Sequence, residues 1–278
     1  MSLESGITKR IFLVGAARSG TTLLQSMIAA HSQVHSFPET HFFTLVPRSG
    51  KKQYIVPLGE RQREKVKMFL EEVERADLIR LLPRATYSKK KWARGLIHIL
   101  DELTVQSGYH MWLEKTPMHL YYIDLITEVA PDTQFIHMIR NGQDVVASTY
   151  DATRKYPEEW GGSRSIDQCI GRWTNDVELS RKYLGQSGHV FIRYEELVSS
   201  PETQLKRICS GLSLPYETEM LEFQKGAENL IYKEELWKKH NIEEIQKRSK
   251  FKSVFTEVEQ QRVIELVEGI SLEDFSSA

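Results

Sequence analysis

A glycine-containing segment near the N-terminus has the residue types and spacing of a phosphate-binding loop. It reads GAARSGTT over residues 15–22, follows an apolar run at 10–14, and precedes a helical pattern. In a strand–loop–helix unit of this kind, backbone N–H groups and the positive end of the helix dipole face an anion. The sequence therefore predicts that a phosphate-bearing ligand is held by Arg18, Ser19, Gly20, Thr21 and Thr22.

The same loop argues against a nucleoside triphosphatase. Such enzymes carry the pattern G-x-x-x-x-G-K-[ST], and here Thr21 stands at the position of the lysine. Because that lysine contacts the β- and γ-phosphates, its absence disfavours transfer of a γ-phosphoryl group. A loop that keeps the glycines, lacks the lysine and carries Arg18 favours a different phosphate-bearing donor.

Arg140 and Ser148 form a second candidate phosphate site. The apolar run at 134–139 ends in Arg140, and a helical pattern that contains Ser148 follows. A magnesium-dependent P-loop enzyme usually ends this strand with an acidic metal ligand, whereas a guanidinium suits bidentate contact with phosphate. The alternative is structural, with Arg140 paired to a carboxylate and Ser148 facing solvent. The glycine loop upstream favours phosphate binding.

The elements that position these residues alternate between short apolar runs and longer amphipathic stretches. This order predicts an α/β fold of the P-loop type, with one domain over residues 1–278 and a central parallel sheet of about 4–5 strands flanked by helices. We expect strands at 11–14, 34–37, 111–113, 134–139 and 190–192, and helices at 21–30, 60–82, 91–105, 120–129, 143–153, 166–184, 201–211 and 256–267. We read 46–59 and 156–165 as loops. Ligands bind such sheets at the carboxyl ends of the strands, which the candidate residues follow.

The composition narrows the class of protein. A net charge of −1 argues against a general nucleic-acid or anionic-membrane binder, so an anion site must be a local pocket. Two cysteines, no apolar run long enough to span a bilayer and no apolar signal segment predict a cytoplasmic protein without a membrane span. No His, Cys, Asp or Glu cluster has metal-ligand spacing, so we expect no metal, and nothing specifies the oligomeric state.

These segments, in this order, resemble the sulfotransferase family, which uses 3′-phosphoadenylyl sulfate (PAPS). The glycine loop is similar to the family's 5′-phosphosulfate loop, and Arg140 and Ser148 match its 3′-phosphate arginine and serine at the same spacing. The segment FIRYEEL resembles the strand–Tyr-Glu–helix element near the nucleotide, which implies that Tyr194 contacts the donor. The basic segment before Phe255 lacks the family's Arg-Lys-Gly triplet, and the resemblance implies contacts from Ser249 and Lys252 alone.

The resemblance also implies a catalytic base and a bridging cation. The family's strand-end lysine corresponds to Lys115, but Pro117 stands where many cytosolic sulfotransferases have a catalytic histidine. The segment at 30–40 resembles that of tyrosylprotein sulfotransferases, whose catalytic glutamate corresponds to Glu39. We therefore expect Glu39 to be the base, and Lys115 with Arg18 to balance negative charge. His41 is the second candidate for the base, because an ordinary imidazole titrates near neutrality.

The function implied is transfer of the sulfuryl group of PAPS to a hydroxyl, phenol or amine, in line and without a metal, which leaves 3′-phosphoadenosine 5′-phosphate (PAP). The acceptor is a small molecule, a glycan, a lipid or a peptide, and the sequence does not choose among them. One alternative is a small-molecule P-loop kinase, which would bind ATP–Mg²⁺ despite Thr21 and Arg140. The other is a non-enzymatic nucleotide-binding protein on the same fold, whose signature would be loss of Glu39 or Lys115.

Overall fold

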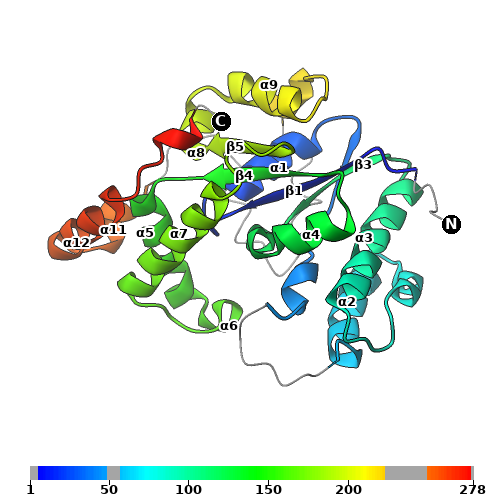
Figure 1. The fold of residues 1–278 in the computed structure, drawn as a ribbon. Helices are drawn as coiled ribbons and strands as arrows, with labels where there is room; N and C mark the ends of the chain where they lie inside the picture. Colours follow the sequence, from blue (N-terminus) through cyan, green and yellow to red (C-terminus); the bar gives the residue numbers. More distant parts are fainter. Residues whose placement is uncertain (1–5, 49–56, 223–248, 277–278) are drawn as a thin grey trace.

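The computed structural model describes residues 6–48, 57–222 and 249–276, and within them five parallel strands form one sheet (Figure 1). The strand order is β2-β3-β1-β4-β5. The strands are β1 (Lys9–Gly15), β2 (Val34–Ser36), β3 (Met111–Lys115), β4 (Thr133–Ile139) and β5 (His189–Arg193). The predicted parallel sheet is thus confirmed, with strand ends that differ from the prediction by one or two residues.

Strand β1 lies at the centre and pairs with β3 on one side and β4 on the other. Its side chains alternate between two hydrophobic cores, with Ile11 and Leu13 on one face of the sheet and Phe12 and Val14 on the other. All four are fully buried. Burial of both faces explains why the strand is continuously apolar rather than alternating.

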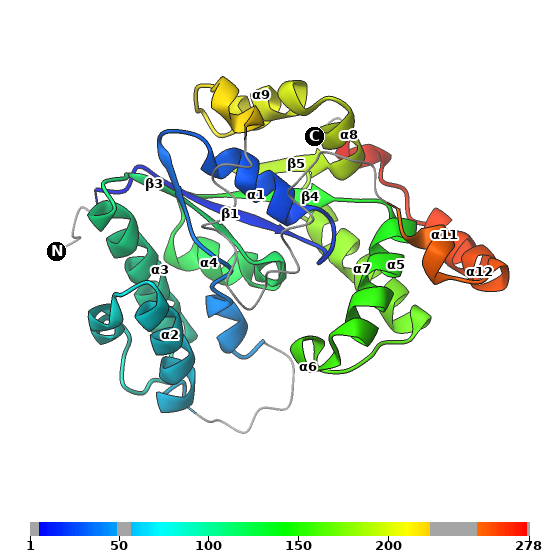
Figure 2. The same ribbon diagram turned by 180° about the vertical axis from the view of Figure 1, so that it is seen from behind.

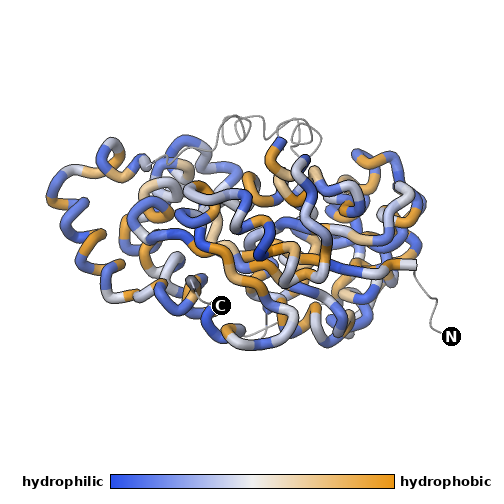
Figure 3. The backbone as a smooth tube through the Cα atoms, turned by 90° about the horizontal axis from the view of Figure 1, so that it is seen from above, coloured by the Kyte–Doolittle hydropathy of each residue, from blue (hydrophilic) through white to orange (hydrophobic). Residues whose placement is uncertain are grey.

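Helices cover both faces of the sheet, as the two opposite views in Figures 1 and 2 show. The face that carries Ile11 packs against α1 (Thr21–Ala29), α8 (Tyr194–Ser199) and α9 (Pro201–Gly211). The opposite face packs against α2 (Glu60–Glu72), α3 (Lys89–Gln106), α4 (Ile123–Val129), α5 (Gly142–Lys155), α7 (Ile166–Arg181), α11 (Phe251–Val254) and α12 (Glu257–Glu268). Figure 3 shows apolar segments running through the middle of the molecule between these layers.

Some predicted helices are shorter than expected. The helix predicted at 60–82 ends at Glu72, and a separate 3₁₀ helix, η2 (Ala76–Leu81), follows. The break has a backbone cause, because Glu74 has φ +57° and a left-handed residue cannot continue a right-handed helix. The helix predicted at 120–129 likewise begins as the 3₁₀ helix η3 (Pro117–Tyr122), and the one predicted at 166–184 ends at Arg181.

The two predicted loops have different outcomes. The segment at 156–165 contains a short helix, α6 (Pro157–Trp160), so the prediction of a plain loop was wrong there. Of the segment at 46–59, residues 49–56 lie outside the described residues, and Leu58 forms an isolated bridge with Thr86. Within the three described ranges, no helix combines the length and the apolar character needed to cross a bilayer.

Candidate active site

The three central strands deliver the candidate residues to one edge of the sheet. The glycine loop follows β1, Lys115 ends β3, and Arg140 comes directly after β4. Since β1 lies between β3 and β4 and all three run parallel, their carboxyl ends meet at the same edge. This is the edge at which open α/β sheets bind ligands.

The loop between β1 and α1 has the form of an anion cradle. Arg18 and Gly20 adopt left-handed conformations with φ +69° and +95°, and the Ser19 hydroxyl donates to the Ala16 carbonyl at 2.5 Å. Helix α1 starts after Gly20 with no side-chain cap and no acidic residue in its first turn. Its first N–H groups and its dipole are therefore available to an anion, so this loop fits a phosphate group.

Tyr194 packs directly on this loop. A Cβ added at Gly20 would lie 2.3 Å from Cδ2 of Tyr194, so the contact between ring and backbone requires a glycine. The guanidinium of Arg140 lies 4.1 Å from the centroid of the same ring, a cation–π geometry. The ring of Tyr194 thus touches both of the elements that the sequence predicts to bind phosphate.

The two predicted phosphate elements also contact each other. Arg18 Nε donates to Ser148 Oγ at 3.1 Å, and Arg140 Nη1 lies 3.4 Å from the carbonyl oxygen of Arg18. Arg140 also pairs with Asp144 at 3.2 Å on the first turn of α5. Burial, and next the neighbouring charge of Arg140, lower the pKa of Arg18. The negative charge of an anion bound between the two guanidinium groups would oppose both effects, because it favours the charged form of Arg18.

Lys115 and Glu39 form a largely buried ion pair at the end of β3. Their side chains are 2% and 12% exposed, and Lys115 Nζ also lies 3.4 Å from Thr22 Oγ1 at the start of α1. His41 Nε2 lies 3.5 Å from the other carboxylate oxygen of Glu39, but its side chain is 53% exposed. The structure therefore brings Glu39, Lys115, Thr22 and His41 together, with Glu39 in the more enclosed position.

Glu114 organises this corner, and our sequence analysis did not identify it. Its carboxylate is fully buried and accepts hydrogen bonds from the backbone N–H and hydroxyl of Thr40, from the Thr116 hydroxyl and from His119. Burial favours a raised pKa, but His119 and these hydrogen bonds outweigh it and hold the pKa of Glu114 below its usual value. The segment that carries Glu39 is thereby fastened to β3. The only signal in the sequence is that two charged residues, Glu114 and Lys115, directly follow the apolar run at 111–113.

His119 and His137 are both fully buried within the fold. His119 Nε2 accepts the backbone N–H of Phe43 at 3.2 Å while Nδ1 faces Glu114. His137 lies in the middle of β4, with Nε2 2.9 Å from Nδ1 of His189. Burial lowers the pKa of both members of this second pair.

The C-terminal candidates lie apart from this cluster. Ser249 Oγ accepts the backbone N–H of Phe251 at 3.3 Å, and Lys252 is exposed on α11. Within 6–48, 57–222 and 249–276, neither forms a hydrogen bond or ion pair with another candidate residue. Their neighbour Lys250 pairs with Asp151 of α5 at 2.6 Å, so the segment lies beside the helix that carries Ser148. The same ranges hold no group of three or more His, Cys, Asp or Glu side chains arranged to bind a metal ion.

A parallel α/β sheet with an anion cradle between its central strand and the next helix defines a P-loop type of fold. The chain belongs to the sulfotransferase family, whose model matches residues 10–218. It is 25% identical over 222 residues to the protein-tyrosine sulfotransferase of Drosophila melanogaster, across 77% of this chain and 40% of that protein. The chain spans from 27% to 52% of the length of the first curated relatives that it matches.

Solved structures of sulfotransferases share the fold. The sulfotransferase domain from the curacin biosynthetic pathway has a TM-score of 0.63 and 22% identity, over 94% of this chain and 97% of that one. A mouse sulfotransferase complexed with PAP has a TM-score of 0.55 and 15% identity, over 97% of this chain and 86% of that one. The expected family and fold are therefore confirmed.

Proposed function

We propose that this protein transfers the sulfuryl group of PAPS to a hydroxyl, phenol or amine of an acceptor. The observation that carries the proposal is the position of Lys115, whose amine lies between the carboxylate of Glu39 and the hydroxyl of Thr22. One cation thus adjoins both the candidate base and the anion cradle. An acid–base group beside a phosphate cradle is what transfer of a group from a phosphate to a hydroxyl or amine requires.

Two sets of residues, which flank the Arg18 side chain in space, would hold PAPS. The loop from Ser19 to Thr22 would bind the 5′-phosphosulfate, where backbone N–H groups meet the start of α1. Arg140 and Ser148 would bind the 3′-phosphate, with the ring of Tyr194 supporting the Arg140 guanidinium. The observed contact between Arg18 and Ser148 supports this division, because it makes the two anion sites adjacent.

PAPS supplies a sulfuryl group on a phosphate leaving group, so a new bond from sulfur to the acceptor oxygen or nitrogen replaces the S–O bond to PAP. Glu39 would accept the proton that the acceptor loses. Lys115 and Arg18 would stabilise negative charge as it develops on the departing phosphate, in a site from which much of the water is excluded. Glu114 would keep the Glu39 segment in position through Thr40. A small molecule, a glycan, a lipid or a peptide could each offer the required group.

Thermal unfolding with nucleotides tests the donor half of the proposal. PAP, ATP–Mg²⁺ and 5′-AMP would be compared, because 5′-AMP lacks the 3′-phosphate that PAP carries. A ligand at about 100 times its dissociation constant stabilises the folded state by roughly 2.7 kcal/mol. For a chain of this size, that raises the unfolding temperature by at least several degrees.

We expect PAP to raise the unfolding temperature and 5′-AMP and ATP–Mg²⁺ to have little effect. Stabilisation by ATP–Mg²⁺ alone would overturn the proposal in favour of a kinase. No stabilisation by any of the three would favour a protein that does not use this donor.

A further inference from the structure

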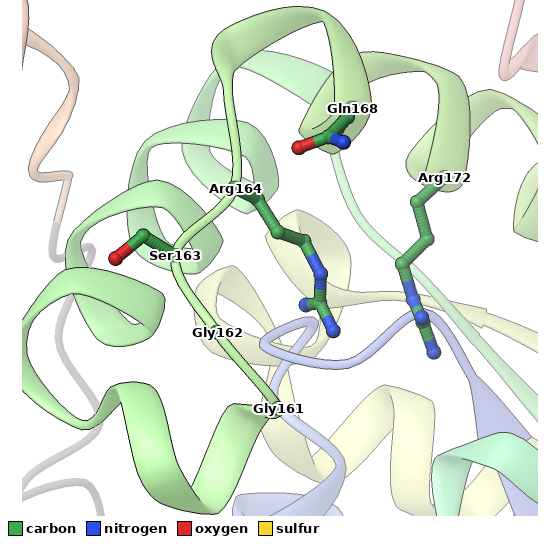
Figure 4. A pocket seen from close by; sticks show the side chains of 6 residues that line it. All are labelled: Gly161, Gly162, Ser163, Arg164, Gln168 and Arg172. Carbon is green, nitrogen blue, oxygen red and sulfur yellow. The ribbon is translucent and has the colours of Figure 1, made fainter.

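A hollow of about 320 Å³ lies where the chain passes from α6 into α7 (Figure 4). Its lining consists of Gly161, Gly162, Ser163, Arg164, Gln168 and Arg172. None of these residues is acidic, and none has a large apolar side chain. Figure 4 shows the guanidinium groups of Arg164 and Arg172 extending into the same space. A Cβ at Gly161 or Gly162 would meet nothing within 4 Å, so this wall of the hollow is open.

Neither arginine forms an ion pair within residues 6–48, 57–222 and 249–276. Arg164 Nη2 donates to the Trp160 carbonyl at 3.2 Å, and Arg172 contacts the sulfur of Met118, a weak acceptor. Arg164 Nη1 and Arg172 Nε are buried, and neither has a hydrogen-bond partner in the described part of the chain. Burial, and next the charge of Arg172, lower the pKa of Arg164. Buried guanidinium N–H groups without acceptors are costly, and an anion would satisfy them.

One carboxylate lies close by, but it does not balance the positive charge. Asp176 of α7 is buried and accepts a hydrogen bond from Tyr121. Its ionised form is favoured by Arg172, Arg48 and Arg164, yet burial still raises its pKa to about 6. Asp176 therefore supplies at most one negative charge beside the two guanidinium groups of the hollow. Guanidinium groups in this arrangement suit the two oxygens of a carboxylate or a phosphate.

The hollow borders the candidate active site. Arg172 also lines a small cavity of about 10 Å³ together with Ala16 and Ala17 of the glycine loop. A molecule in the hollow would therefore lie beside the cradle, separated from it by Arg172.

We propose that the hollow between Arg164 and Arg172 binds an anionic group of the sulfuryl acceptor, a carboxylate or a phosphate. The proposal rests on the sulfotransferase function argued above and adds the chemical class of its acceptor. The donor occupies the cradle formed by Ser19 to Thr22, on the other side of Arg172. The acceptor places its reacting hydroxyl near Glu39 and its negative charge at the two arginines.

Calorimetry on PAP-saturated protein tests this assignment. Saturation with PAP fills the cradle, so inorganic phosphate and acetate then report on a separate anion site. Arg164→Gln and Arg172→Gln each remove one guanidinium, and Arg80→Gln removes an exposed arginine on η2 as a matched control. We expect phosphate to bind saturably to the wild type and the control, and both hollow variants to weaken it by roughly tenfold, equivalent to about 1.4 kcal/mol.

A second titration links the hollow to the acceptor. We expect 4-hydroxyphenylacetate and 4-hydroxyphenyl phosphate to bind more tightly than the neutral 4-hydroxyphenylacetamide, and inorganic phosphate to compete with both. Whichever of the two anionic phenols binds more tightly shows whether the hollow prefers a carboxylate or a phosphate. In Arg164→Gln and Arg172→Gln, we expect each anionic phenol to bind no more tightly than the neutral amide.

The outcomes separate this proposal from the function on which it rests. Failure of PAP to bind the wild type would overturn the proposed function. If PAP binds but phosphate binds the hollow variants as it binds the wild type, the anion site is wrong. Loss of PAP affinity in those variants would assign the arginines to the donor instead. Equal binding of the anionic phenols and the amide would overturn the acceptor assignment.

Discussion

Glu39 and Lys115 form an ion pair at the carboxyl end of β3, although they are 76 residues apart in the sequence. Glu39 comes from the segment after β2, and Lys115 ends the neighbouring strand β3. Because little of either side chain is exposed, removing one partner leaves the charge of the other without compensation. The same ion pair therefore contributes both to the stability of the fold at the end of β3 and to the proposed catalytic site.

Replacing the candidate base should separate catalysis from donor binding. Glu39→Gln preserves shape but cannot accept a proton, so we expect turnover to fall by roughly 10²- to 10⁴-fold while PAP affinity is retained. The free variant should also be less stable than the wild type, because Lys115 loses its partner. Turnover with an acceptor that the wild type uses, together with PAP calorimetry, measures both effects.

His41→Ala is the matched control for this variant. His41 lies beside Glu39 but is half exposed, so we expect the variant to keep most of its turnover. The reverse pattern, with Glu39→Gln active and His41→Ala inactive, would assign the proton transfer to His41.

The contact between Gly20 and Tyr194 can be tested with a single methyl group. Gly20→Ala places a side chain at φ +95° and drives its Cβ into the ring of Tyr194, so we expect PAP affinity to fall by roughly tenfold or more. Strain and overpacking together should lower the free energy of unfolding by about 2–4 kcal/mol. Denaturant unfolding and PAP calorimetry measure the two effects.

Gly108→Ala provides the control for backbone strain. Gly108 has φ +81°, but its Cβ would meet nothing within 4 Å. This variant should lose about 1 kcal/mol from strain alone and bind PAP like the wild type. Equal losses of PAP affinity in the two variants would show that the contact with Tyr194 does not shape the cradle.

Glu114 should behave as a positioning residue for Glu39. Glu114→Gln keeps the volume of the side chain but replaces one carboxylate oxygen with an NH₂ group. That group would face a Thr or His donor and could not accept its hydrogen bond, which should lower the free energy of unfolding by about 1–3 kcal/mol. Because Thr40 would lose its anchor, we expect a fall in kcat with unchanged PAP affinity. A pure stability defect would leave kcat of the folded fraction unchanged.

Asp101→Asn supplies the comparison for Glu114→Gln. Asp101 is also buried, and it accepts hydrogen bonds from Arg10 and from the indole of Trp112, away from Glu39. We expect this variant to lose stability by a similar amount and to keep its kcat. If kcat falls equally in both variants, Glu114 has no specific role in positioning Glu39.

Asp176 should make stability depend on pH in a defined direction. Burial raises its pKa from 3.8 to about 6, so the folded protein holds a proton that the unfolded chain has already released. Its contribution to the free energy of unfolding therefore falls as pH rises from about 4 to about 6, by roughly 3 kcal/mol. Asp176→Asn removes this titration.

Denaturant unfolding of the wild type and Asp176→Asn at several pH values checks the sign. The variant should gain stability relative to the wild type between pH 4 and 6 and keep a constant advantage above pH 7. Since other titrating groups are common to both proteins, they cancel in the difference. A difference that does not change with pH would show that Asp176 has an ordinary pKa.

The sheet could be predicted because its strands are buried on both faces and are therefore apolar without interruption. Helix ends were less predictable, and Glu74 shows why, since its left-handed backbone splits a pattern that reads as one helix. The sequence places Arg18 and Ser148 in two separate motifs, and the structure brings their side chains into contact. The role of Glu114 in holding the Glu39 segment could not be read from local sequence, because its partner Thr40 is 74 residues away. The same holds for the hollow, since the eight-residue spacing of Arg164 and Arg172 does not reveal that both face one space.

The pairing of β1 with strands from much later in the chain has a consequence for folding. The register joins Lys9 to Met111 and Arg10 to Thr133, so the central strand finds its neighbours only after more than a hundred residues have been synthesised. Such non-local pairing is slow, because the chain pays the entropy of closing long loops before the contacts form. The glycine loop, Lys115 and Arg140 become neighbours only at that late stage. If the cradle binds PAP as proposed, PAP affinity is a probe of late folding, because an intermediate without this pairing has no assembled cradle.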